Sequence, residues 1–138
     1  MLNKKVQDAI NAQINAEFWS AYLYLSMSAF ANTKGYPGIA NWFEIQYQEE
    51  LDHVKIFFDY DLQSDGEVKL QPIDGVPTKW GSPLNMFEET LKHEQKVTSL
   101  INNLYSVSLA ENDFATQSML KWFIDEQVEE EESAKTII

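Results

Sequence analysis

The stretch Gln48-Glu49-Glu50-Leu51-Asp52-His53 decides the fold, because it sets two metal-ligand side chains into a helical pattern. Residues three apart on a helix lie on one face, about one turn from each other, so Glu50 and His53 point the same way. Both fall on the apolar stripe of their segment, which consists of Ile39, Phe43, Gln46, Glu50, His53, Phe57 and Tyr60. This period predicts a helix whose buried face carries a carboxylate and an imidazole.

Three further segments repeat the arrangement, and each apolar stripe is interrupted near its middle by polar residues that include Glu17, Glu94 or Glu130. The three stripes are Val6, Ile10, Gln13, Glu17, Tyr24, Met27 and Ala31; Phe87, Leu91, Glu94, Thr98, Ile101 and Tyr105; and Leu120, Phe123, Gln127, Glu130, Ala134 and Ile137. An isolated buried carboxylate is costly or takes up a proton. Four carboxylates and one imidazole directed at one core therefore predict a cation site, and this oxygen-rich set favours iron or manganese, with two bridged metals balancing the charge.

Length and composition fit a single domain over residues 1–138, with 44% hydrophobic residues and no cysteine. The lack of cysteine excludes disulfide, zinc-thiolate and iron–sulfur chemistry. A net charge of −12 disfavours nucleic-acid binding and suits a protein that attracts metal cations, although it also serves solubility. The sequence has neither an apolar signal region nor a run of about 18 apolar residues, so we expect no membrane partner and a cytoplasmic location.

The lengths of the connections predict the topology. Helices are expected at about 4–33, 38–62 and 83–110, and from 114 to the end, with short turns at the first and third links. The middle link of about eighteen residues can span about 60 Å, which exceeds the length of about 38 Å of a 25-residue helix. Short, long and short links predict an all-α, antiparallel four-helix bundle with one long crossover.

Five motifs resemble those of a known family: Asn11-Ala12-Gln13-Ile14-Asn15-Ala16-Glu17, Tyr22-Leu23-Tyr24-Leu25-Ser26-Met27, Gln48-Glu49-Glu50-Leu51-Asp52-His53, His93-Glu94 and Phe123-Ile124-Asp125-Glu126-Gln127-Val128-Glu129-Glu130-Glu131. In this combination the chain resembles the bacterial non-haem ferritins, over nearly its whole length. The resemblance implies a ferritin-like di-iron domain with ferroxidase activity. Such an enzyme oxidises two Fe(II) ions with dioxygen or hydrogen peroxide and stores ferric mineral inside a hollow shell of 24 identical subunits.

The resemblance also implies a role for each candidate ligand. Glu17, Glu50 and His53 match the ligands of the first iron, with Glu50 bridging the two ions. Glu94 and Glu130 match the ligands of the second iron.

Further residues around this set match positions of the family. Gln127 would lie beside the iron pair as a hydrogen bonder. Tyr24 matches a central tyrosine that hydrogen-bonds a ligand or supplies an electron, although it could also be a core aromatic residue. A third iron site is implied at Glu49, Glu126 and Glu129, and the alternative for these three is a solvated acidic face.

At several positions this sequence differs from members of the wider ferritin-like superfamily, and these differences exclude some of their features. Leu51 stands where the haem-binding relatives place a methionine, so we expect no haem. Rubrerythrins and bacterioferritins repeat the Glu-x-x-His pair on the fourth helix, where this chain has Gln127 and Glu130. The chain stops at Ile138, inside the fourth helix, so the family's short fifth helix is expected to be absent.

Two alternatives to an iron store remain open at this point. One is a di-metal bundle that consumes oxygen or peroxide without storage, and the other is a structural bundle without metal. Four aromatic residues exceed what the stripes can bury and predict subunit contacts, in the 24-subunit shell or an antiparallel dimer, unless they pack under the crossover. These residues are Trp19, Tyr22, Trp42 and Trp80.

Overall fold

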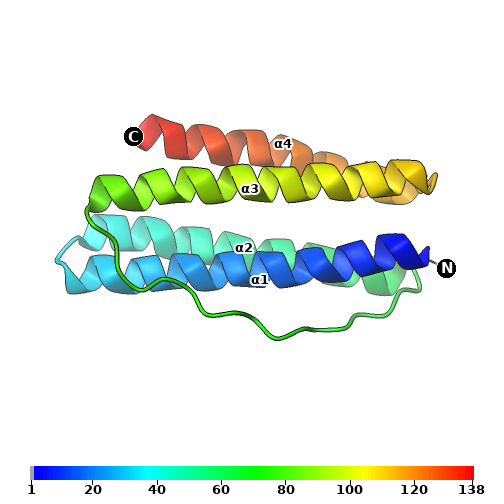
Figure 1. The fold of residues 1–138 in the computed structure, drawn as a ribbon, viewed down its shortest axis with the longest axis horizontal. Coiled ribbons are helices and arrows are strands. Elements are labelled where there is room, and N and C mark those ends of the chain that lie inside the picture. The colour runs from blue at the N-terminus through cyan, green and yellow to red at the C-terminus, as the bar shows by residue number, and fades with distance from the viewer. Residues whose placement is uncertain (1) are drawn as a thin grey trace.

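The computed structural model describes residues 2–138, which form four long helices lying side by side (Figure 1). The helices are α1 (Lys4–Thr33), α2 (Pro37–Gln63), α3 (Pro83–Ala110) and α4 (Phe114–Ile137). Residues 2–138 contain no strand. The all-α bundle and its helix boundaries confirm the fold expected from the sequence, with differences of about one residue that lie within the usual uncertainty of helix ends.

Local signals explain where the helices begin. The Asn3 side chain accepts hydrogen bonds from the Lys5 and Val6 amides at 2.9 and 3.3 Å, which satisfies two amides in the first turn of α1. The Asn85 amide donates to Ser82 Oγ at 3.0 Å, and proline occupies the first turn of α3. Local caps of this kind fix the helix starts independently of the tertiary fold.

The crossover between α2 and α3 runs along the outside of α1 (Figure 1). Side chains of α1 hold its backbone: the Glu67 amide donates to Gln7 Oε1 at 2.9 Å, and Trp19 Nε1 donates to the Gly75 carbonyl at 3.2 Å. Ser26 Oγ donates to the Pro77 carbonyl at 2.6 Å. The α1 residues from 7 to 26 span about 28 Å, and a fully extended segment from 67 to 77 would span about 33 Å, so the crossover is nearly extended.

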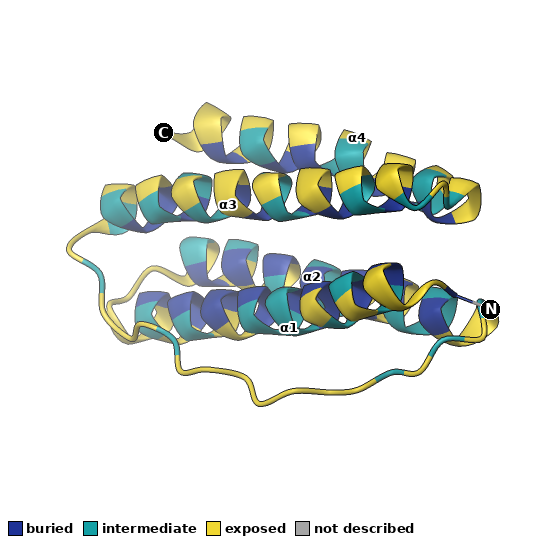
Figure 2. Cartoon of the chain, turned by 45° about the vertical axis from the view of Figure 1, so that its right-hand side comes forward, coloured by how far each residue is buried: buried dark blue, intermediate teal, exposed yellow. Residues whose placement is uncertain are grey.

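Two apolar clusters fill the bundle, one on each side of a polar layer, and the buried residues face inward on every helix (Figure 2). The first cluster includes Ile10, Phe57 and Phe123, and the second includes Met27 and Phe43. Between them, in the middle of the helices, lie the glutamates that interrupt the stripes. The apolar clusters therefore keep bulk water away from this layer.

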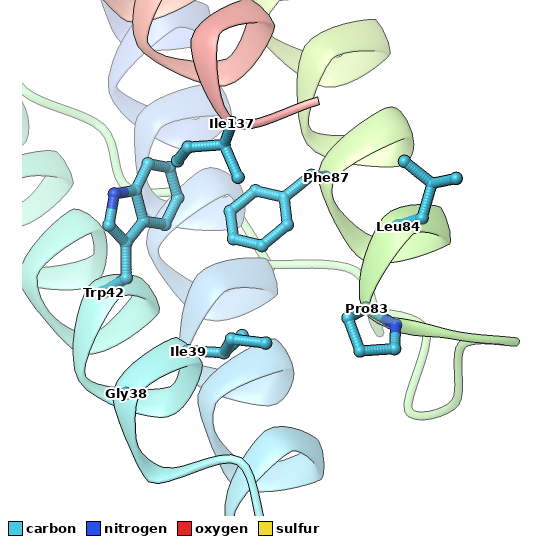
Figure 3. A pocket seen from close by; sticks show the side chains of 7 residues that line it. All are labelled: Gly38, Ile39, Trp42, Pro83, Leu84, Phe87 and Ile137. Carbon is cyan, nitrogen blue, oxygen red and sulfur yellow. The ribbon is translucent and has the colours of Figure 1, made fainter.

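The four aromatic residues expected at subunit contacts lie in three environments. Trp19 is bonded to the crossover, and the Trp80 ring packs on Phe30 at 5.5 Å, so the alternative of packing under the crossover applies to these two. Trp42 packs on Phe87 at 5.2 Å in an apolar hollow where Ile137 of α4 also points (Figure 3). Tyr22 is 51% exposed. Within residues 2–138, none of the helices combines the length and the apolar character that a membrane span needs.

Candidate metal centre

Each helix contributes one glutamate to the buried polar layer. Glu17 comes from α1, Glu50 from α2, Glu94 from α3 and Glu130 from α4, and none is more than 8% exposed. His53, one turn after Glu50, is 3% exposed. The sequence predicted that these five side chains would be buried, and all five are buried.

Three of the five side chains form a compact group that fits a cation. The ligand atoms of Glu17, Glu50 and His53 lie within 4.8 Å of one another. His53 Nδ1 is 3.3 Å from Glu50 Oε2 and 3.7 Å from Glu17 Oε2, and none of these three buried atoms has a hydrogen-bond partner. Buried polar atoms are nearly always paired, so three unpaired atoms directed at one another are what a bound cation would satisfy.

Glu94 lies beside this group and is held by two neighbours. The Tyr24 hydroxyl donates a hydrogen bond to Glu94 Oε1, and Gln127 Nε2 donates one to Glu94 Oε2 at 3.1 Å. Gln127 Nε2 also lies 3.3 Å from Thr98 Oγ1. Tyr24 and Gln127 therefore contact the carboxylate that the sequence assigned to the second metal, and they fix its orientation.

A second acidic group lies towards the surface. Carboxylate oxygens of Glu49, Glu126 and Glu130 lie within 4.8 Å of one another, and only Glu130 is buried. Glu129, which the sequence placed with Glu49 and Glu126, is exposed and lies outside this group. Glu130 thus stands between the buried layer and the outer acidic group.

Burial and the neighbouring charges shift the pKa values of the carboxyl groups in the layer. Burial and the charge of Glu17 raise the pKa of Glu50 well above its usual value. Burial, then the charges of Glu94 and Glu49, raise the pKa of Glu130 to about 9. Burial raises the pKa of Glu94 as well. Without a cation, burial and mutual repulsion therefore favour the protonated forms of Glu50, Glu94 and Glu130.

Two members of the layer ionise more readily than burial alone would allow. Burial raises the pKa of Glu17, but the neighbouring Glu50 and His53 outweigh this effect, so the net shift is downward. Burial lowers the pKa of His53, but the nearby Glu17 carboxylate outweighs it and the net pKa is raised. A cation bound in the layer would pair with the ionised Glu17 and would displace protons from the carboxyl groups whose pKa is raised.

Sequence reasoning missed two supporting residues. Gln13 Nε2 donates to Glu17 Oε1 at 3.1 Å, and Thr98 Oγ1 lies 2.6 Å from Glu131 Oε2. Both residues stand on the apolar stripes four positions from a buried glutamate. That spacing was the available signal, because residues four apart face each other along a helix.

Comparisons with known proteins agree with this architecture. A family model described as a ferritin-like domain matches residues 7–138. The bacterial non-heme ferritin of Bacteroides fragilis is 46% identical over 138 residues, which cover 100% of this chain and 87% of the relative. The bacterial non-heme ferritin of Staphylococcus saprophyticus is 42% identical over 139 residues, 100% of this chain and 83% of the relative. A crystal structure of an open pore ferritin from Archaeoglobus fulgidus superposes with a TM-score of 0.98 at 44% identity, covering 99% of this chain and 85% of that one.

Proposed function

Since the chain belongs to the ferritin family, we propose that it stores iron by oxidising Fe(II) to Fe(III) at the buried polar layer and depositing the product as ferric mineral. The oxidant is dioxygen or hydrogen peroxide. The observation that carries the proposal is the group of unpaired buried atoms on Glu17, Glu50 and His53. A carboxylate and imidazole set of this kind suits iron.

Binding of the substrate follows from the arrangement of the ligands. The first Fe(II) binds at Glu17, Glu50 and His53, and the second at Glu94 and Glu130, with Glu50 shared between them. Each ion replaces protons that burial holds on the carboxyl groups. Two Fe(II) ions supply two electrons, which together with two protons reduce one molecule of dioxygen to hydrogen peroxide. Positive charge that accumulates on the iron is balanced by the carboxylates.

Tyr24 and Gln127 act on the second ion through Glu94. Their hydrogen bonds use one lone pair on each oxygen of Glu94, which fixes the carboxylate and leaves a second lone pair on each oxygen for a metal. Gln127 is a positioning residue in this scheme. Tyr24 has two roles, as a hydrogen-bond donor to Glu94 and as a source of one electron.

The outer acidic group provides a third iron position, which passes iron between the centre and the mineral. Glu49 and Glu126 hold it together with Glu130, which also belongs to the centre. Glu129, first assigned to this site, is exposed beside it on α4 and contributes charge. We place the protein in the cytoplasm as a shell of 24 identical subunits, without haem.

The variant Glu50→Ala tests the centre. Glu50 serves both ions, so we expect fast Fe(II) oxidation to fall by at least about 100-fold, since loss of supporting partners around a metal alone costs about 10–100-fold. Glu44→Ala, at an exposed position of the same helix, is the matched control and should keep the parent rate. Stopped-flow absorbance after aerobic addition of Fe(II) measures both. Equal rates in Glu50→Ala and the parent would disprove the assigned site.

A separate experiment tests whether the protein stores iron. Particle mass and retained iron, measured after aerobic loading and gel filtration, separate storage from simple consumption of oxygen. Iron that co-elutes with a large particle supports storage. Complete loss of iron from the protein fraction, with oxidation intact, would leave a di-metal oxidase as the function.

A further inference from the structure

We propose that Trp19 is an electron donor to the buried centre and that its electron passes by way of His93 to Tyr24. This inference rests on the proposed function, because the centre must first create an electron deficit on Tyr24. Through this route the deficit moves from the core to the edge of the molecule, where a reductant in solution can fill it.

A continuous set of aromatic rings joins the three residues. The Tyr24 ring is fully buried, and its edge faces His93 with centroids 5.9 Å apart and an angle of 80°. The His93 ring lies 5.2 Å from the Trp19 ring. At the inner end, the Tyr24 hydroxyl is bonded to Glu94. The rings therefore connect the carboxylate layer to α1's outer face in two short steps.

Hydrogen bonds fix the middle of this route. Ser20 Oγ donates to the Ala16 carbonyl at 3.0 Å, so its hydrogen is already used. The 2.7 Å contact between Ser20 Oγ and His93 Nε2 is then a bond in which the imidazole N–H donates. His93 is thereby held in one orientation between the two larger rings.

Trp19 ends the route beside solvent. Its Nε1 donates to the Gly75 carbonyl of the crossover at 3.2 Å. It also lines two hollows beneath the crossover, of about 240 and 370 Å³, and both hollows are also lined by His93 and Lys96. An oxidised indole loses its N–H proton readily. Here the N–H group of Trp19 has the Gly75 carbonyl as its acceptor, and the two hollows beside it have room for water.

The transfer balances in electrons and protons. The hydrogen peroxide formed by the first two Fe(II) ions takes one electron from a third Fe(II) ion and one from Tyr24, and with two protons from solvent it becomes two molecules of water. The Tyr24 phenol proton passes to Glu94 Oε1. Trp19 then gives one electron to the Tyr24 phenoxyl, which takes its proton back from Glu94. The Trp19 radical cation releases its Nε1 proton to water. A one-electron reductant in solution, such as a further Fe(II) ion, and one proton from water restore the indole.

Two other tryptophans serve as matched controls. Trp42 is also one ring away from Tyr24, because it packs on Phe43 at 5.1 Å and Phe43 stacks on Tyr24 at 6.0 Å. Trp80 lines one of the same hollows as Trp19 but packs on Phe30. Trp19→Phe, Trp42→Phe and Trp80→Phe each remove one indole and keep an aromatic ring in its place.

The first experiment follows radicals after aerobic addition of three Fe(II) ions per subunit, by freeze-quench electron paramagnetic resonance. In the parent we expect a tyrosyl signal that gives way to a tryptophanyl signal. In Trp19→Phe the tyrosyl signal should live several-fold longer and the tryptophanyl signal should be lost, while the first oxidation of Fe(II) keeps its rate. Trp42→Phe and Trp80→Phe should behave like the parent.

The second experiment needs no iron and separates this inference from the proposed function. In metal-free protein, azidyl radicals from pulse radiolysis oxidise indoles, and transfer to tyrosine appears as decay of the indolyl absorption and growth of the phenoxyl absorption. Trp19→Phe should lose a fast part of this transfer that both control variants retain. Equal transfer in all three variants overturns the route, as does a loss confined to Trp42→Phe. Fe(II) oxidation that fails in the parent would overturn the proposed function alone.

Discussion

At the scale of one residue, Glu130 shows how a buried carboxyl group of the candidate metal centre makes the stability of the fold depend on pH. Its pKa is raised to about 9, from a usual value of 4.5, by burial and by the charges of Glu94 and Glu49. Between these two values the folded protein binds more protons than the unfolded chain. Stability therefore falls as pH rises through this window. The raised pKa values of Glu50, Glu94 and His53 act in the same direction, and the lowered pKa of Glu17 opposes them.

The metal-free protein should consequently melt at a lower temperature near about pH 8 than near about pH 5.5, because folding retains protons that unfolding releases. Glu130→Gln mimics the protonated carboxyl, so it should reduce this dependence on pH. Differential scanning calorimetry at the two pH values measures both effects. Glu88→Gln, at an exposed position of α3, is the control. A parent protein that melts higher at the more alkaline pH would contradict the assigned protonation.

The sequence predicted correctly which candidate ligands are buried, but it predicted less well how they group. Glu17, Glu50, His53, Glu94 and Glu130 stand on apolar stripes, and a period of this kind determines which face of a helix is buried. The division into an inner group and an outer group depends on side-chain rotamers and on the rotation of each helix, which the period leaves open. Glu129 illustrates this, since a helix turns by about 100° per residue and Glu130 takes the position beside Glu49 and Glu126.

At the scale of the elements, side chains of α1 form hydrogen bonds with the extended backbone of the crossover. In a sheet, the backbone of a neighbouring strand would form these bonds. Asn11 is the clearest case. Its Nδ2 donates to the Glu67 carbonyl at 2.9 Å, and its Oδ1 accepts from the Lys69 amide at 2.9 Å. One amide side chain thus pairs with a donor and an acceptor of the extended backbone, as a neighbouring strand would.

Asn11→Ala should destabilise the protein by about 1–3 kcal/mol relative to a matched control, because two hydrogen bonds are lost and each contributes about 0.5–1.5 kcal/mol. The control is Asn103→Ala at an exposed position of α3, since both changes gain the same helix propensity. Urea unfolding followed by circular dichroism gives the two free energies of unfolding. Equal values for the two variants would mean that the Asn11 bonds contribute nothing to holding the crossover.

Helix boundaries could be predicted from the sequence, but the path of the crossover could not. The boundaries follow from local signals such as Pro83 after Ser82, and from Gly35, which adopts a φ of +82° just after α1. The crossover depends on Gln7, Asn11 and Asn15, whose partners lie 56 to 60 residues away in the chain. Polar residues on an exposed helix face look alike in sequence whether they bind water or a distant backbone.

At the scale of the whole molecule, the side of α1 that carries the crossover exposes large apolar side chains. Tyr22 and Leu25 of α1 are 51% and 41% exposed, and Leu70 and Ile73 of the crossover are 63% and 44% exposed. Soluble proteins keep large apolar patches for contact with partners. Because a two-fold interface uses the same patch twice, this face can bury itself against a second copy of the chain.

We therefore expect the protein to self-associate through this face and, as proposed above, to build a 24-subunit shell. Leu70→Glu should shift the particle towards smaller species, because burying an unpaired charge in an apolar contact costs several kcal/mol. Ser99→Glu adds the same charge at an exposed position of α3 and should leave the mass unchanged. Sedimentation velocity measures all three proteins. A monomeric parent at micromolar concentration would contradict self-association, and a parent that stops at a dimer would rule out a closed shell and, with it, mineral storage.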